Sequence, residues 1–212
     1  MLSYRKYIFS PFQVNTYLIY DNETGYAAVI DPGCSNDGER DFLLKEIGKL
    51  NLDLQLIINT HLHIDHIFGN NFLKKEFDAK LIYPQGDEFL LPIMHEEAEK
   101  FGARLEETPK ADVYFENIDK IKLGETAFEP LFTPGHTPAE YCLYCEQESI
   151  CFTGDVLFRE SIGRTDLWEG DYDLLIESIY SKLFVLPEAT IVLPGHGEQT
   201  TIGYEREYNP FL

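Results

Sequence analysis

The stretch Ile57-Ile58-Asn59-Thr60-His61-Leu62-His63-Ile64-Asp65-His66 places four metal-binding side chains directly after an apolar run. Residues 54–59 are predicted to form a buried strand, because they are a short run rich in leucine and isoleucine. His61, His63, Asp65 and His66 then crowd into one turn at the end of this strand. Imidazole and carboxylate groups are ligands that proteins offer to zinc and similar ions. The stretch therefore predicts a metal centre, and a hydrolytic one is our first hypothesis.

The other histidines strengthen this hypothesis by their positions. The chain has six histidines, and five of them follow β-like runs in short turns. His136 lies in Thr133-Pro134-Gly135-His136, His196 lies in Leu193-Pro194-Gly195-His196, and Asp155 ends the run 150–155. Only His95 lies elsewhere, in a helical, acid-rich segment where we expect its side chain to be exposed. Scattered structural histidines would not sort in this way, so His136, Asp155 and His196 join the candidate site.

The order His-x-His-x-Asp-His, then His136, Asp155 and His196, resembles the metallo-β-lactamase superfamily. The resemblance extends from Asp31-Pro32-Gly33 to the last histidine. It implies an α/β (α+β) fold, a four-layer αββα sandwich of two mixed sheets flanked by helices, with the metals at one sheet edge. It also implies two sites: a first metal on His61, His63 and His136, and a second on Asp65, His66 and His196, with Asp155 bridging them.

The resemblance implies a reaction as well. A hydroxide held between two cations is available near neutral pH, because metal ligation lowers the pKa of water from about 15.7 to about 7. This metal-bridging hydroxide would be the nucleophile, and Asp65 would orient it or accept its proton. Nitrogen and oxygen ligands suit zinc, iron and manganese similarly. We expect two divalent ions, with zinc as the default.

Within the superfamily, the sequence favours a thioesterase-like branch. His63 stands where the oxygen-reducing diiron branch has glutamate, and Asp155 stands where the commonest β-lactamases have cysteine. The segment 153–170 resembles the corresponding loop of glyoxalase II (hydroxyacylglutathione hydrolase), with Gly163 and Arg164 followed by Glu169-Gly170. That resemblance implies that Arg164 binds the substrate; the alternative is that Arg164 pairs with Asp166 or Glu169 to fix the loop.

The chain departs from full-length glyoxalase II after His196. We expect no counterpart of the C-terminal helical extension that binds glutathione in that enzyme, and Gly197-Glu198 replaces the aromatic residue expected there. Residues 200–212 resemble instead the ending of short bacterial glyoxalase II-like hydrolases, and we interpret them as a packed strap carrying Pro210 and Phe211. We therefore expect a small-molecule substrate, a thioester, and leave the acyl group and the thiol open.

Two alternatives to the hydrolase remain. A persulfide dioxygenase shares the Gly163-Arg164-Thr165-Asp166 loop and the metal-binding residues, but uses one iron ion and oxygen. In that case Asp65, His66 and His196 would bind no second metal. The other alternative is a metal-binding protein that hydrolyses nothing. Metal content and turnover separate these functions.

Composition bounds the other function classes. With 212 residues, 44% of them hydrophobic, the chain can bury a large core, and we expect one domain over residues 1–212. A net charge of −20 repels phosphate backbones and speaks against nucleic acid as a partner. The N-terminus has no apolar signal-peptide core, and no apolar run approaches the ~20 residues that span a bilayer. We expect a cytoplasmic protein without membrane contact.

The four cysteines predict no disulfide framework. Cys142 and Cys145 lie in a β-like run, where positions three apart face opposite sides of a sheet, so we favour buried thiols over a zinc or redox pair. Cys34 follows Asp31-Pro32-Gly33 near the expected metal rim and is either reactive or an inert loop thiol.

The predicted elements alternate strands with a few helices. Strands are predicted at 4–9, 14–20, 26–30, 54–59, 80–83, 121–123, 127–132, 140–145, 149–152 and 190–193, and helices at 37–50, 66–77, 86–102 and 172–184. Segment 86–102 either forms a lid over the metals or packs at the edge.

Overall fold

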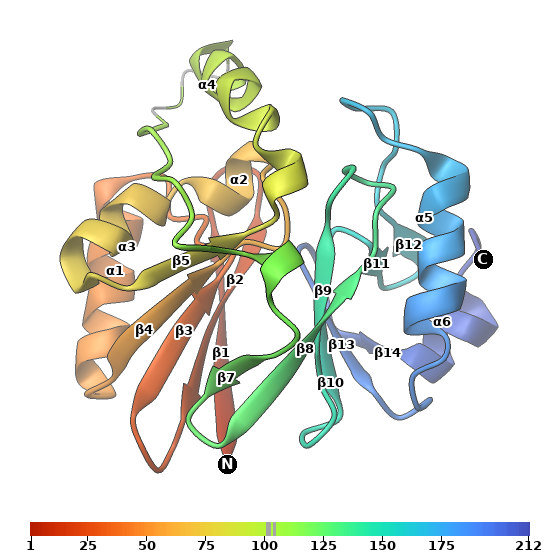
Figure 1. The fold of residues 1–212 in the computed structure, drawn as a ribbon, viewed down its shortest axis with the longest axis horizontal. Helices are drawn as coiled ribbons and strands as arrows, with labels where there is room; N and C mark the ends of the chain where they lie inside the picture. Colours follow the sequence, from red (N-terminus) through yellow and green to blue (C-terminus); the bar gives the residue numbers. More distant parts are fainter. Residues whose placement is uncertain (101–102, 104) are drawn as a thin grey trace.

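The computed structural model describes residues 1–100, 103 and 105–212, and two mixed sheets dominate it (Figure 1). Each of the two sheets has six strands. The first has the order β1-β2-β3-β4-β5-β6, and the second has the order β14-β13-β10-β9-β8-β7. The first sheet consists of β1 (Leu2–Phe9), β2 (Val14–Asp21), β3 (Tyr26–Ile30), β4 (Asp53–Ile58), β5 (Lys80–Tyr83) and β6 (Val113–Tyr114). The second consists of β7 (Ile121–Leu123), β8 (Thr126–Phe132), β9 (Tyr141–Cys145), β10 (Ile150–Gly154), β13 (Ile191–Pro194) and β14 (Thr200–Thr201).

Both sheets combine antiparallel and parallel pairs. In the first sheet, β1 to β3 are antiparallel, whereas β3 to β6 are joined in parallel. In the second sheet only β10 and β13 pair in parallel. The parallel strands β3, β4, β10 and β13 all end at the edge that carries the candidate metal ligands.

Helices cover the outer faces of both sheets (Figure 1). The first sheet carries α1 (Asp37–Lys49) and α3 (Asn70–Phe77), and the second carries α5 (Tyr172–Ser178), its π-helical continuation (Ile179–Leu183) and α6 (Ile202–Tyr208). Two further helices, α2 (Ile64–Ile67) and α4 (Leu90–Lys100), lie toward the metal-ligand edge. Single turns of 3-10 helix cover Gln85–Asp87 and Phe115–Asn117, and a small hairpin joins β11 (Leu157–Phe158) to β12 (Ser161–Ile162). This is the four-layer αββα sandwich that the sequence predicts.

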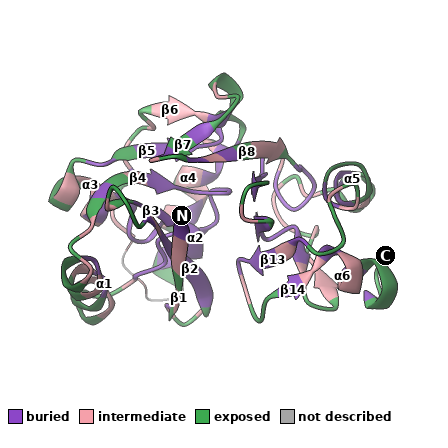
Figure 2. Ribbon diagram, turned by 90° about the horizontal axis from the view of Figure 1, so that it is seen from below, coloured by how far each residue is buried: buried purple, intermediate pink, exposed green. Residues whose placement is uncertain are grey.

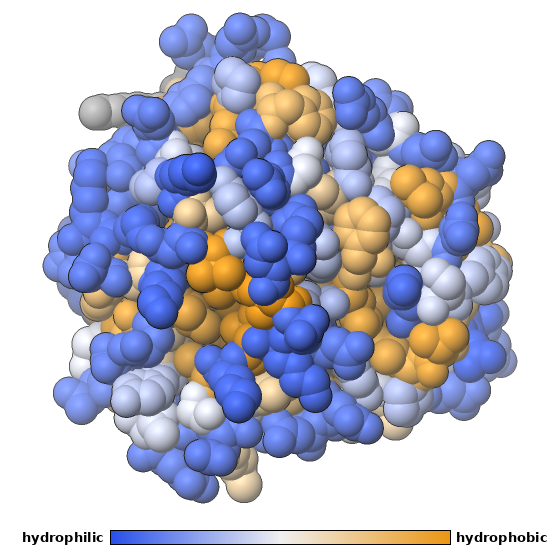
Figure 3. Space-filling view, in the orientation of Figure 1, coloured by the Kyte–Doolittle hydropathy of each residue, from blue (hydrophilic) through white to orange (hydrophobic). Residues whose placement is uncertain are grey.

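Many residues in the strands of both sheets are buried (Figure 2). Ile19 points between the sheets, where it joins Phe128 and Phe152, while its neighbour Leu18 points to the helical side of the first sheet. Successive residues of a strand face opposite sides, so each buried strand supplies two apolar layers. Hydrophilic side chains cover most of the face seen in Figure 3, with hydrophobic ones in smaller groups between them.

All four cysteines are buried and free, and the burial of Cys142 and Cys145 was predicted. Cys142 packs on the helical side of the second sheet, whereas Cys145 packs between the sheets, so the two thiols do not form a pair. Cys34 is fully buried, and burial raises the pKa of its thiol to about 12. Almost no thiolate forms there at neutral pH, which favours the inert loop thiol over the reactive one.

Several predicted elements differ from the structure. The helix predicted at 66–77 is two helices, α2 and α3, separated at Phe68 and Gly69. A side chain at Gly69 would place its Cβ 2.6 Å from Cys34 Sγ, and the Gly69 N–H donates to Pro32 O at 2.7 Å, so the chain turns there against the loop after β3. The helix predicted at 172–184 changes to π-helix at Ile179.

The prediction of a packed strap at 200–212 is wrong, because residues 200–208 form a short strand and a helix. Thr200 and Thr201 pair with β13 as β14, and Thr201 then caps α6 by accepting a hydrogen bond from the N–H of Tyr204. Phe211 is about half exposed rather than packed. His95 is half-buried rather than exposed, and residues 101 and 102 of the predicted segment 86–102 lie outside the described residues. In the part of the chain that is described, no helix has the length and apolar character needed to cross a bilayer.

Candidate metal centre

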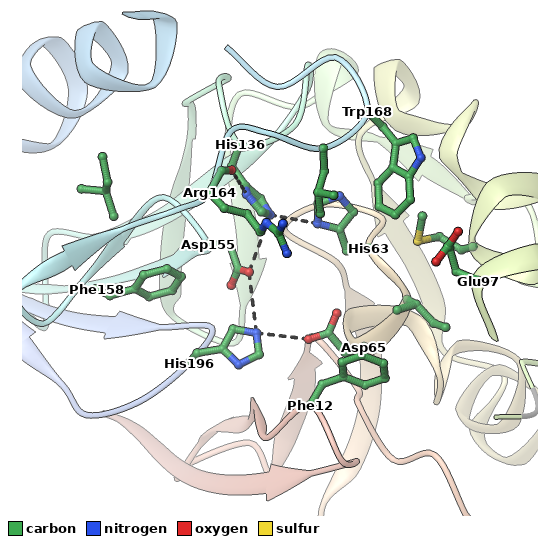
Figure 4. A pocket seen from close by; sticks show the side chains of 14 residues that line it. Phe12, His63, Asp65, Glu97, His136, Asp155, Phe158, Arg164, Trp168 and His196 are labelled. Carbon is green, nitrogen blue, oxygen red and sulfur yellow. Dashed lines mark hydrogen bonds and ion pairs between the residues drawn. The ribbon is translucent and has the colours of Figure 1, made fainter. Parts of the chain in front are cut away.

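The predicted ligand residues meet at one edge of the two sheets (Figure 4). His61, His63, Asp65 and His66 follow β4, His136 lies between β8 and β9, Asp155 follows β10, and His196 follows β13. Strand ends from both sheets therefore bring together residues as far apart in sequence as 61 and 196. All seven predicted residues take part in groups whose nitrogen and oxygen atoms lie within 4.8 Å of one another.

The first group consists of His61, His63 and His136. His63 Nδ1 lies 2.9 Å from His136 Nε2, so the two rings present nitrogen atoms to the same point. His61 Nε2 is buried and has no hydrogen-bond partner. Three imidazole nitrogens that converge in this way are a common ligand set for a catalytic metal.

The second group consists of Asp65, His66 and His196. His196 Nε2 lies 3.1 Å from Asp65 Oδ2, and His66 Nε2 lies 3.7 Å from the same oxygen. His63 caps α2 with an extended backbone, whereas Asp65 and His66 lie in its first turn, so the chain changes there from extended to helical. One short segment thus serves two groups.

Asp155 lies between the two groups. Its Oδ1 is 3.5 Å from His66 Nε2, and its Oδ2 is 3.6 Å from both His136 Nε2 and His196 Nε2. The space around this carboxylate is tight, since a side chain at Gly195 would place its Cβ 2.3 Å from Asp155 Oδ1. A carboxylate in this position can reach an ion in either group.

Unpartnered polar atoms indicate that the residues fit a cation. His61 Nε2, His66 Nε2 and Asp155 Oδ1 are buried without hydrogen-bond partners. Leaving a buried polar atom unpaired costs about 1–3 kcal/mol each, so several together call for a missing partner. Divalent cations held by the two groups would give each of the three atoms a partner.

The charge states of the groups suit metal binding. Burial lowers the pKa of His61 and lowers that of His63 to about 3, so both rings are neutral, which is the ligating form. Burial would raise the pKa of Asp155, but His66 and His196 outweigh it and lower the pKa, so this carboxyl is ionised. Burial would lower the pKa of His66, but the neighbouring carboxylates, Asp65 first, raise it well above its usual value. The centre holds carboxylates that attract positive charge.

Two buried acids that the sequence analysis did not assign to the site hold the ligands in place. Glu140 Oε1 lies 3.3 Å from His61 Nδ1, and Asp31 Oδ2 lies 3.1 Å from His66 Nδ1. A carboxylate beside the second nitrogen of a ligating histidine fixes the ring and raises its basicity. The available signal was an acid flanking an apolar run: Asp31 directly follows β3, and Glu140 directly precedes β9.

A third buried acid, Asp87, ties the first two ligand loops together. It accepts hydrogen bonds from the N–H of Leu62 at 3.3 Å and of Ala139 at 3.0 Å. Leu62 lies between His61 and His63, and Ala139 follows His136 by three positions. Asp87 therefore fixes the distance between the segments that carry the first ligand group.

A cavity of about 470 Å³ opens over the centre. Its walls come from the turn between β1 and β2, from α2 and α4, from the segment 158–168 and from the loops that carry His136, Asp155 and His196 (Figure 4). The lining residues are Phe12, His63, Ile64, Asp65, Met94, Glu97, His136, Asp155, Phe158, Ile162, Arg164, Leu167, Trp168 and His196. Met94 and Glu97 place α4 in the cavity wall, so the segment 86–102 contributes directly to the site.

Arg164 lies at the rim of this cavity. Its Nε and one terminal nitrogen donate to the two carboxylate oxygens of Asp166 at 2.7 and 2.8 Å. Its backbone carbonyl oxygen lies 2.7 Å from His136 Nδ1. The pairing of Arg164 with Asp166 that the sequence suggested is therefore confirmed, and contact of Arg164 with a substrate stays a prediction.

Comparisons with known proteins agree with this geometry. The family model described as "Metallo-beta-lactamase superfamily" matches residues 9–196. Hydroxyacylglutathione hydrolase GloC of Haemophilus influenzae is 41% identical over 95% of this chain and 93% of its own length. The mitochondrial persulfide dioxygenase ETHE1 of Homo sapiens is 32% identical over 93% of this chain and 70% of its own length.

Two solved structures are similar over the whole fold. The crystal structure of BLEG-1 B3 metallo-beta-lactamase has a TM-score of 0.89 and 36% identity, covering 99% of both chains. The crystal structure of TTHA1623 in a di-iron-bound form has a TM-score of 0.85 and 31% identity, covering 98% of this chain and 100% of the other. With the convergent His and Asp groups and the two packed sheets, these matches establish that the chain belongs to the metallo-β-lactamase superfamily.

Proposed function

We propose that this chain is a glyoxalase II-like hydrolase that cleaves a small-molecule thioester at a centre of two divalent metal ions, with zinc as the default. The observation that carries the proposal is the position of Asp155, whose oxygens lie 3.5–3.6 Å from nitrogen atoms of both ligand groups. A bridging carboxylate is a device for holding two ions side by side. The 41% identity with hydroxyacylglutathione hydrolase GloC supports the reaction class.

His61, His63 and His136 would hold the first ion, and Asp65, His66 and His196 would hold the second, with Asp155 shared. When bound, such ions lower the pKa of water to about 7 and polarise a carbonyl oxygen. Asp65 lines the cavity as well as the second group, so it is placed to orient a water molecule or to accept its proton.

The rest of the reaction needs little from the protein. A thiolate with a pKa of about 8.5 leaves without first being protonated, so a thioester requires no general acid. Arg164 at the cavity rim is the residue that we propose to contact the substrate. Its ion pair with Asp166 leaves the hydrocarbon stem and the flat face of the guanidinium for that contact.

The second candidate is a persulfide dioxygenase that uses one iron ion and oxygen. The 32% identity with human ETHE1 favours it. The convergence of Asp65, His66 and His196 supplies the second ligand group that a two-metal hydrolase needs. The dioxygenase branch shares these residues, so metal content separates the two functions. A metal-binding protein without activity is the third possibility, and the open cavity over the centre argues against it.

Metal analysis together with turnover tests the proposal. Protein purified without chelator is assayed for zinc, iron and manganese, beside hydrolysis of S-lactoylglutathione and of a thioester without glutathione. About two ions per chain with thioester cleavage is the expected result. One iron per chain with oxygen uptake on a persulfide would replace the proposal with the dioxygenase. Full metal occupancy without turnover of any of these compounds would favour the metal-binding protein.

A further inference from the structure

Apart from Glu97, Arg164 and the candidate metal ligands, the cavity walls are apolar. The residues that give this character are Phe12, Ile64, Met94, Phe158, Ile162, Leu167 and Trp168. Met94 is fully buried and belongs to the core cluster of the first sheet, on which Trp168 also packs. The Trp168 ring lies 5.6 Å, centre to centre, from the ring of His63 (Figure 4). The apolar wall formed by Met94, Leu167 and Trp168 therefore begins directly beside the reaction centre.

Away from the metal centre, the charged side chains of the cavity are poorly suited to an anionic ligand. Arg164 is the one Lys or Arg among the described residues that line it, and Asp166 binds its guanidinium through two hydrogen bonds. The same contact lowers the pKa of Asp166 to about 2, so the pair stays ionised at neutral pH. Glu97 adds a negative charge to the wall and is bound by Lys100 at 2.7 Å.

A glutathione moiety carries two carboxylates and one ammonium group. Away from the metal centre, its carboxylates would meet Arg164 and Glu97, each already paired with a group of opposite charge, on a chain of net charge −20. An ionised group that loses water without gaining a partner is penalised, whereas apolar surface gains about 25 cal/mol per Å² when it is buried. The charges and the apolar walls of the cavity therefore both favour a ligand that is uncharged and apolar.

We propose that the substrate carries an uncharged, apolar group next to its thioester bond, and that this group lies against the apolar wall of Met94, Leu167 and Trp168. The inference rests on the proposed thioester hydrolysis and narrows its substrate class. The apolar group belongs either to the leaving thiol or to the acyl part. In both cases the wall holds the apolar group of the substrate, and it thereby positions the neighbouring carbonyl carbon over the candidate metal ligands.

The first experiment compares three substrates on the metal-loaded enzyme: S-lactoylglutathione, the lactoyl thioester of benzyl mercaptan, and S-phenylacetylglutathione. We expect kcat/KM to be at least about tenfold higher for one of the two aromatic compounds, since a well-filled apolar pocket discriminates by roughly 10–200-fold. A preference for the benzyl thioester assigns the group to the thiol, and a preference for the phenylacetyl compound assigns it to the acyl part. Equal or higher kcat/KM for S-lactoylglutathione would overturn the inference.

The second experiment changes the wall. Leu167→Asp is expected to lower the ratio of kcat/KM for the preferred aromatic substrate to kcat/KM for S-lactoylglutathione about tenfold or more. Ile8→Asp serves as the matched control, because Ile8 is an exposed aliphatic residue on β1 outside the cavity lining. Equal losses on both kinds of substrate would show that the wall is structural and would refute the inference.

Binding separates this inference from the proposed hydrolysis. Trp168 is the one tryptophan of the chain, so its fluorescence reports directly on the wall. Benzyl methyl thioether, which cannot be hydrolysed, is expected to change this fluorescence at lower concentration than S-methylglutathione. If the thioether changes the fluorescence as expected but no thioester is hydrolysed, the proposed hydrolysis is refuted and the apolar binding site is supported. If S-lactoylglutathione is hydrolysed but the thioether does not change the fluorescence, the proposed hydrolysis is supported and the apolar binding site is refuted.

Discussion

The carboxylate of Glu140 links His61 to Asp155. Glu140 Oε1 accepts a hydrogen bond from the Asp155 N–H at 2.7 Å and lies 3.3 Å from His61 Nδ1, while the whole side chain is buried. One oxygen therefore fixes a ring of the first ligand group and the backbone of the residue between the groups. Movement of Glu140 would disturb both groups at once.

Replacing Glu140 is accordingly expected to weaken metal binding. Glu140→Ala removes the acceptor beside His61, and loss of such supporting carboxylates typically lowers metal affinity about 10–100-fold. Competition with a chelator of known affinity measures the change for each ion. Glu129→Ala, at an exposed position on β8, is the control and should bind metal as the wild type does. If Glu140→Ala binds metal as tightly as the wild type, the hydroxyl of Thr60 suffices to orient the His61 ring, since Thr60 Oγ1 lies 3.0 Å from His61 Nδ1.

Replacing Asp155 tests the bridging position itself. Asp155→Ala removes oxygens that lie near His66, His136 and His196, so both ions should lose a ligand. We expect metal content to fall from two ions per chain and turnover to fall by more than about a hundredfold, which exceeds the usual loss for a supporting residue. Elemental analysis and the thioester assay measure the two effects. Two tightly bound ions in the variant would contradict the bridging role.

Gly195 offers a test of how tightly the centre is built. In Gly195→Ala the new Cβ would meet Asp155 Oδ1 at 2.3 Å and Gly154 O at 3.0 Å, so Asp155 must move. Metal affinity should drop while the fold remains. Gly48→Ala is the matched control, since no atom lies within 4 Å of the new Cβ in helix α1, and it should raise stability by about 0.4–1 kcal/mol. Unchanged metal affinity in Gly195→Ala would show that the segment after β13 adapts.

Particular residues show what the sequence could predict. Polar residues at strand ends were enough to place the ligands, because strand exits gather at one edge of a sheet. The predicted strands 26–30, 80–83 and 121–123 have the observed bounds, since their apolar runs are sharply delimited. Interruption of the helix at Gly69 depends on the distant loop at Pro32 and Cys34, so local pattern could not reveal it. Glu140 likewise gains its role from contacts across the fold.

Asp87 is expected to give stability a specific pH dependence. Burial raises its pKa to about 6, whereas a free aspartate has a pKa of about 3.9. Between these values the folded state binds more protons than the unfolded state, so the free energy of unfolding falls as pH rises from about 4 to about 6. Asp87→Asn cannot titrate and should lack this component. Urea unfolding of metal-free protein across that range measures it, with the exposed Asp53→Asn as control. Parallel profiles for wild type and Asp87→Asn would contradict the assignment.

Asp166 is expected to limit the use of anionic substrates through Arg164. Its carboxylate occupies Nε and a terminal nitrogen of the guanidinium at 2.7 and 2.8 Å, and both side chains are mostly exposed. Asp166→Asn removes the charge that neutralises Arg164, so the cation can pair with a substrate carboxylate. We expect kcat/KM for S-lactoylglutathione to rise about two- to fivefold, as an exposed pair of up to about 1 kcal/mol allows. The gain should shrink as salt screens the charges, and kcat/KM for an uncharged thioester should not change. Arg164→Gln in the same background should abolish the gain; if the gain persists without Arg164, the effect comes from the loop and not from the freed cation.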